Sequence, residues 1–144
     1  MHGPRTANSP MTAGKTDRPA AGHILRYVYL FEEEQRRGRD EGVKERFVVV
    51  VGVEGSRYLV AAITTKGEGR KNAVAIPDEI ARAAGLAPGS AIVVSEFNRF
   101  TWPGFDIRPL MKQPGYIAGR LPPRFTAKTI DAIAAWGAAA VDRD

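Results

Sequence analysis

The stretch that decides the fold is RFVVVVGVEGSRYLVAAITT, residues 46–65. It contains two runs rich in β-branched and other apolar residues, 47–51 and 57–65, on either side of a short segment with glycine at its centre. Such runs are typical of strands, and a glycine-containing turn between two of them predicts a β-hairpin. The first run is apolar without a break, which predicts a strand buried on both faces.

The length of the turn decides which side chains face each other across this hairpin. If the loop has three residues, 54–56, then Val53 pairs with Arg57, and counting outward places Arg46 directly opposite Thr64. Opposed residues share one face of the sheet, with Cβ atoms about 5 Å apart. A loop of two residues would break the pairing, because a slip of one residue reverses the faces. The Arg46–Thr64 pair is therefore expected on the condition that the loop has three residues.

Upstream of the hairpin we expect a strand, a charged loop and a tail. Residues 23–31 are rich in aromatic and branched side chains, which predicts a strand. Residues 32–45 are highly charged and include two glycines, so we expect a mobile loop that is a candidate lid. Residues 1–21 lack periodicity, and we expect a flexible N-terminal tail before one domain spanning residues 22–144.

Downstream of the hairpin, short strands alternate with two helices. Strands are predicted at residues 72–76, 92–94, 100–103 and 116–121. A short helix is predicted over residues 77–85, with proline in its first turn and glycine at its end. A second helix is expected from Pro122 and Pro123 through about Ala140. This order predicts a mainly β, α+β fold in which a barrel-like sheet carries peripheral helices.

Composition limits the classes of function. The chain has 144 residues, a one-domain length, and its net charge of +5 favours an acidic partner, either nucleic acid or an acidic protein segment. It has no cysteine and only two histidines, which excludes disulfides and argues against a zinc site, so no metal or cofactor is expected. With no signal peptide and no apolar run of membrane-spanning length, a soluble cytoplasmic protein is expected, without a membrane partner.

Arg46 and Thr64 suit phosphate chemistry. A guanidinium group is permanently charged, and its planar fork matches phosphate oxygens. A threonine hydroxyl can donate to a non-bridging oxygen, and preorganised donors of this kind stabilise the charge that develops in a transition state. The plain alternative is an arginine at the edge of the sheet beside an ordinary strand threonine.

Several segments, taken in order, resemble the PemK/MazF toxin family over roughly residues 22–137. They are GHI (22–24), ERFVVVV (45–51) and AAITT (61–65), and, for a PemK-like branch, EFNRFTWPG (96–104), RP (108–109) and GRLP (119–122). The chain departs from the family pattern at two positions. His23 stands where the family has Asp, and Phe47 stands where it usually has Pro.

The resemblance implies a small SH3-like, half-open β-barrel that forms a homodimer, cleaves single-stranded RNA without a metal and is neutralised by an acidic antitoxin protein. It implies that Arg46 and Thr64 are catalytic, with Glu41 as an additional acid. The implied reaction is attack of the ribose 2′-hydroxyl on the adjacent phosphate. Arg46 would stabilise the phosphorane, because its high pKa makes it a poor base.

Basic and aromatic residues around the hairpin are candidate RNA contacts. We expect Lys44, Lys66, Arg70 and Lys71 to lie along phosphates. Trp102 belongs to an aromatic cluster that could stack on bases or form a dimer interface, and at least two of its companions Phe97, Phe100 and Phe105 are expected in the core.

Two other interpretations stay open. A barrel of the same fold could act through protein contacts alone, since fold does not determine function. Residues 72–94 also resemble the swapped-hairpin DNA-binding domain of the AbrB and MazE type, which would make the chain a DNA-binding regulator.

Overall fold

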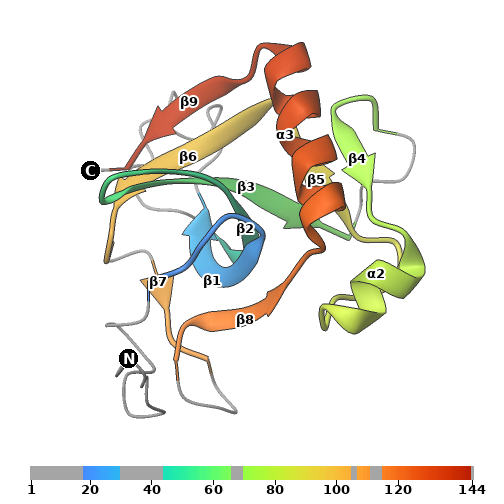
Figure 1. Ribbon diagram of the computed structural model, residues 1–144, viewed down its shortest axis with the longest axis horizontal. Coiled ribbons are helices and arrows are strands. Elements are labelled where there is room, and N and C mark those ends of the chain that lie inside the picture. Colours follow the sequence, from blue (N-terminus) through green and yellow to red (C-terminus); the bar gives the residue numbers. More distant parts are fainter. Residues whose placement is uncertain (1–17, 30–43, 66–69, 105–106, 111–114, 144) are drawn as a thin grey trace, which may run out of the picture.

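A computed structural model describes residues 18–29, 44–65, 70–104, 107–110 and 115–143. Over these ranges the chain is mainly β, with two helices, which confirms the predicted α+β class (Figure 1). The strands are β1 (His23–Tyr29), β2 (Lys44–Glu54), β3 (Arg57–Thr64), β4 (Ala73–Ala75), β5 (Ala91–Val93), β6 (Glu96–Thr101), β7 (Ile107–Arg108), β8 (Ile117–Arg120) and β9 (Ala139–Asp142). The helices are α2 (Asp78–Ala83) and α3 (Pro123–Trp136).

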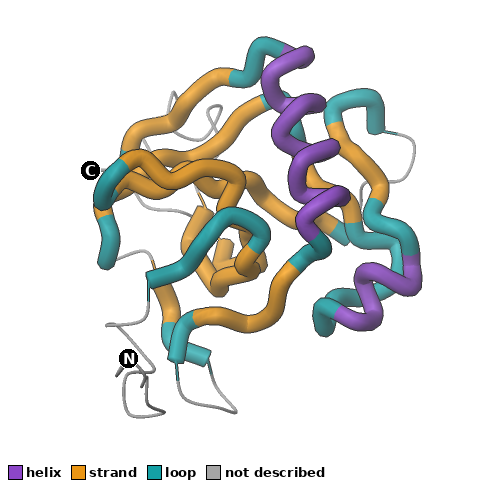
Figure 2. The backbone as a smooth tube through the Cα atoms, viewed as in Figure 1, coloured by secondary structure: helices purple, strands orange, loops and turns teal. Residues whose placement is uncertain are grey.

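All nine of these strands belong to one sheet. Its main path runs β4-β5-β3-β2-β1-β7, while β6 pairs with β3 and β9, and β8 pairs with β1. The pairings are antiparallel except for the parallel pair of β6 and β9. The strands curl around a common centre, and α3 runs along one side of them, between β8 and β9 in the chain (Figures 1 and 2).

The two faces of the sheet bury separate hydrophobic clusters. One cluster includes residues of α2 and α3, and we call its side the helix-side face; its buried members include Ile24, Val49, Val51, Ala61, Ile63, Phe125 and Ile133. The other is rich in rings, and we call its side the aromatic face; its members include Leu25, Tyr27, Tyr29, Val48, Val50, Tyr58, Val60, Phe100 and Trp102. Residues 48–51 alternate between the two clusters, so this part of the predicted run is buried on both faces, whereas Phe47 at its start is exposed.

The predicted hairpin is present as β2 and β3, but its turn is shorter than expected. Glu54 pairs with Arg57, so the loop has two residues, 55–56, and not three. A β-bulge then adds one residue, Val51, between the pairs Val50–Val60 and Gly52–Leu59. The bulge restores the register that a three-residue loop would have produced.

The last helix ends earlier than predicted. Gly137 adopts the left-handed conformation (φ 75°) that commonly terminates helices, because it has no Cβ to clash. The residues that follow were expected to be helical but form β9, which lies parallel to β6 and buries Val141. The two-residue strand β7 was also not predicted.

The fold extends upstream of Gly22, where the domain was predicted to begin. The Nη2 of Arg18 donates to the carbonyl of Gly55 (2.9 Å), and its guanidinium lies over the Tyr58 ring. The Tyr58 hydroxyl donates to the carbonyl of Pro19 (2.8 Å). Residues 18–20 are therefore fastened to the hairpin, whereas the rest of the predicted tail, 1–17, lies outside the described residues, as does most of the predicted lid, up to residue 43.

One further observation bears on the DNA-regulator interpretation, and another on membrane crossing. Residues 72–94 do not stand apart, because β4 and β5 continue the sheet through β3. Neither helix in the described part of the chain has both the length and the apolar character that crossing a membrane requires.

Candidate functional site

Four strand ends meet at one end of the aromatic face. β1 ends at Tyr29, which pairs with Lys44 near the start of β2. β3 ends at Thr64 and runs antiparallel to β6, so the start of β6 at Glu96 lies toward the same end. The ends of these four strands therefore lie toward one end of the sheet.

Alternation along each strand decides which side chains share this face. On β2, Arg46 has the parity of Val48 and Val50, which belong to the aromatic cluster. On β3, Thr64 has the parity of Val60 and Ala62, which belong to the same cluster. On β6, Glu96 and Asn98 have the parity of the buried Phe100.

The structure thus brings Arg46 and Thr64 to the same face and the same end of the sheet. The ladder between β2 and β3 ends at Val48 and Ala62, and continuing its register by two residues sets Arg46 across from Thr64. At that point Thr64 pairs with Ala91 of β5 instead. The two side chains therefore flank the point where β2 and β3 separate.

The group is layered by burial. Tyr27, Tyr29 and Asn98 are fully buried, each with 0% exposure. Arg46, Thr64 and Glu96 are half-buried. The result is a buried polar floor beneath three side chains that solvent, and hence a ligand, can reach.

The buried Tyr29 interacts electrostatically with the half-buried Arg46 and Glu96. Burial raises the pKa of the Tyr29 phenol well above its ordinary value, and the nearby charges of Glu96 and Tyr27 raise it further. The Arg46 guanidinium and a side-chain hydrogen bond with Asn98 act in the opposite direction. Tyr29 therefore stays neutral, and it lies within electrostatic reach of both Arg46 and Glu96.

The other predicted basic contacts lie partly at this end. The backbone of Lys44 belongs to β2, while Arg70 and Lys71 are exposed just before β4. The next residue, Asn72, donates from Nδ2 to the Oγ of Ser95 (3.0 Å), which precedes Glu96. This contact places Arg70 and Lys71 near the start of β6. Two further predicted site residues, Glu41 and Lys66, lie outside the described residues.

Trp102, which was predicted either to stack on bases or to form a dimer interface, is buried in the core. It is 9% exposed and belongs to the aromatic cluster. Its ring packs against Tyr58, Phe100 and Tyr116 at centroid distances of 5.5, 6.4 and 6.1 Å. Phe100 is in the core as expected, and Phe97 is partly buried against the helix-side cluster.

Sequence reasoning missed Glu96, Asn98 and Tyr29 as members of the site. The alternation in EFNRF, residues 96–100, was the available signal, because Phe100 marks the buried parity that Glu96 and Asn98 share. That signal becomes useful only when β6 is known to lie beside β3, a pairing across about 40 residues of chain.

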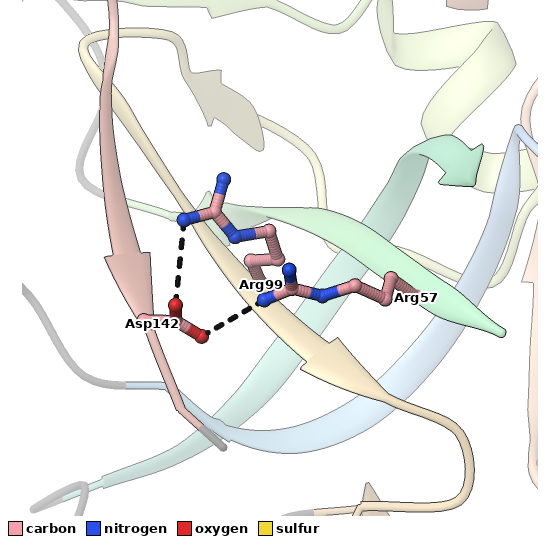
Figure 3. Close-up of polar contacts among 3 residues, drawn as sticks. All are labelled: Arg57, Arg99 and Asp142. Atoms are coloured by element: carbon pink, nitrogen blue, oxygen red, sulfur yellow. Dashed lines mark hydrogen bonds and ion pairs between the residues drawn. The ribbon is translucent and has the colours of Figure 1, made fainter. Parts of the chain in front are cut away.

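A second polar cluster lies on the surface, where Arg57, Arg99 and Asp142 meet (Figure 3). The Nη2 atoms of Arg57 and Arg99 contact the two carboxylate oxygens of Asp142 at 3.2 and 3.4 Å. These side chains are 32–53% exposed, so each ion pair stabilises the protein by at most about 1 kcal/mol. The cluster fastens β9 to β3 and β6.

Comparison with known families and with curated proteins found no match for this chain. Within the described ranges, no group of three or more acidic or histidine side chains is arranged to hold a metal ion.

Proposed function

We propose that this protein is an endoribonuclease of the PemK/MazF type, which cleaves single-stranded RNA without a metal. The observation that carries the proposal is the placement of Arg46 and Thr64 on one face of the sheet, beside Glu96, where four strand ends meet. The net charge of +5 supports an anionic substrate. The curled sheet with α3 at its side supports the finer assignment of a half-open SH3-like barrel.

In this proposal the scissile phosphate binds between Arg46 and Thr64. The guanidinium pairs with one non-bridging oxygen, and the hydroxyl donates to the other. Both donors are held by strands before substrate arrives, so they stabilise the phosphorane charge with little reorganisation. The ribose 2′-oxygen attacks phosphorus, the P–O5′ bond breaks, and the leaving O5′ takes a proton from water, which gives a 2′,3′-cyclic phosphate and a 5′-hydroxyl.

The proton of the 2′-hydroxyl needs an acceptor, which Arg46 cannot provide. Glu96 is the acceptor that the geometry favours, because it is half-buried, reachable, and near Arg46 through their shared neighbour Tyr29. The resemblance offers Glu41 for a comparable role. Protonated Tyr29 and buried Asn98 support this side of the site from below.

The proposal also includes what the resemblance implies about surroundings. The protein would act in the cytoplasm as a homodimer, and an acidic antitoxin would bind over the exposed Arg70 and Lys71. The DNA-regulator interpretation has less support, because residues 72–94 form an integral part of the sheet.

The test is incubation of the purified protein with single-stranded RNA in EDTA. We expect cleavage that leaves 2′,3′-cyclic phosphate ends, and a loss of about 100-fold or more in kcat/KM for Arg46→Ala. Thr64→Ser should retain more activity than Thr64→Val, which lacks the hydroxyl. Arg82→Gln, an exposed arginine on α2, is the matched control and should leave activity unchanged.

Intact RNA under these conditions would refute the nuclease proposal. RNA binding without cleavage would favour a barrel that acts through contacts alone. Equal cleavage by the unmutated protein and Arg46→Ala would remove Arg46 from the site.

A further inference from the structure

A row of three side chains crosses the helix-side face at the end of the sheet near Arg46. Arg26 on β1 pairs with Phe47 on β2 on one side and with Arg108 on β7 on the other. Residues directly opposite each other in a sheet share a face, with Cβ atoms about 5 Å apart. The row therefore places the side chain of Phe47 next to that of Arg26, with Arg108 on the other side of Arg26.

Phe47 is exposed where its neighbours on the same face of β2 are not. Val49 and Val51 are 1% and 8% exposed within the helix-side cluster, but Phe47 is 36% exposed. Its ring thus lies just beyond the edge of the core, and no role is assigned to it by the resemblance, which has proline there.

The two arginines are positioned by backbone carbonyls. Arg26 donates from Nη1 to the carbonyl of Pro109 (2.6 Å), and Arg108 donates from Nη1 to the carbonyl of Ile107 (3.3 Å). Both side chains are half-buried, so their freedom is already reduced.

We propose that Phe47, Arg26 and Arg108 form a nucleotide-binding subsite for single-stranded RNA. A base stacks on the phenyl ring, and a phosphate of the same strand binds the two guanidinium groups, a combination typical of single-strand recognition. The choice of RNA depends on the proposed function. A nucleotide uses both the ring and the charges, whereas an acidic peptide uses only the charges.

The subsite adjoins the candidate catalytic group through β2. Arg46 and Phe47 are consecutive residues whose side chains lie on opposite faces. In the described ladder β2 separates from β3 beyond Val48, so an RNA strand passing that edge contacts both faces. Phe47 would then hold a base next to the scissile phosphate and select the cleavage position.

The experiment measures binding of fluorescently labelled single-stranded RNA by anisotropy, using full-length protein with Arg46→Ala to prevent cleavage. Adding Phe47→Ala or Phe47→Leu should weaken binding by at least about 5-fold, while Phe47→Trp should bind at least as tightly as Phe47. Arg26→Gln and Arg108→Gln should each reduce the slope of log affinity against log salt by about 0.7. Arg82→Gln should have no effect, and circular dichroism confirms that each variant is folded.

Equal affinity of the Phe47→Leu and Phe47→Trp variants would overturn the subsite, because the ring would then have no role. Poly-glutamate can be tested as a competitor of the labelled RNA. If its competition is lost in the Arg26 and Arg108 variants but unchanged in the Phe47 variants, the subsite is also overturned, in favour of an acidic protein partner. The two proposals can be refuted separately. If the Phe47 variants bind RNA more weakly but the unmutated protein does not cleave it, only the nuclease proposal is refuted. If the unmutated protein cleaves RNA but the Phe47 variants bind it normally, only the subsite is refuted.

Discussion

Mild acid should loosen residues 18–20 from the hairpin, because His23 must be neutral to hold them. The amide of Ala20 donates to the Nδ1 of His23 (2.8 Å), and the amide of His23 donates to the carbonyl of Ala20 (3.0 Å). A protonated imidazole carries hydrogen on both nitrogens and cannot accept the first bond. Acidification therefore removes one of the contacts that fasten this segment.

The sign and size of the effect follow from the surroundings of His23. Burial lowers the pKa of His23 below 6.5, and the cross-strand charge of Arg120 lowers it further. The unfolded chain therefore binds the proton more readily, so the stabilisation is complete above pH 6.5 and declines as pH falls toward the folded pKa. The slope cannot exceed about 1.4 kcal/mol per pH unit, and because His23 is only half-buried, screening by solvent reduces the total to about 0.5 kcal/mol.

Urea unfolding between pH 7.5 and 5.5 measures this loss, which corresponds to about 2 °C in Tm. His23→Asn is the informative variant, because its side-chain oxygen can accept the Ala20 amide but does not titrate. Substituting the other histidine, His2→Asn, controls for titration outside the described residues. The reasoning fails if the parent and His23→Asn lose stability equally, or if the parent gains stability on acidification.

Three further changes test the packing that supports the site. Gly119→Ala should lower the free energy of unfolding by about 2 kcal/mol or more, because its Cβ would lie 2.6 Å from the carbonyl oxygen of Ala84, whereas Gly52→Ala meets only the movable end of a leucine side chain and should cost less; urea titration of both decides this. Tyr58→Phe should cost about 1 kcal/mol and speed amide exchange near Ala20, because Pro19 loses its buried donor. Asp142→Asn should change Tm by no more than about 3 °C in low salt and less in 1 M salt, because its ion pairs are exposed.

The local features of the fold were readable from the sequence because their causes are local. Two β-branched runs around Gly55 specify a hairpin, and the proline-led segment from Pro77 specifies a short helix. The end of α3 was misjudged because the alanines beyond Gly137 suit a helix, whereas docking of Val141 beside β6 makes them a strand. Tertiary packing decides such cases where intrinsic preference is weak.

The membership of the candidate site was predictable only in part. Arg46 and Thr64 lie on one hairpin, so counting along a single turn brought them together. Glu96 comes from β6, and Trp102 is buried by rings from other strands, among them Tyr58 and Tyr116, so no local pattern reports either outcome.

The prediction that Arg46 and Thr64 share a face was made for the wrong reason, since the loop is one residue shorter than assumed and the bulge at Val51 supplies the missing residue. The valines of residues 48–51 suit either face, so this run alone does not select the register. Without the bulge, every residue of β2 before it would change face relative to β3, and Arg46 would no longer share a face with Thr64. One unpaired valine therefore keeps the candidate catalytic residues Arg46 and Thr64 on the same face of the sheet.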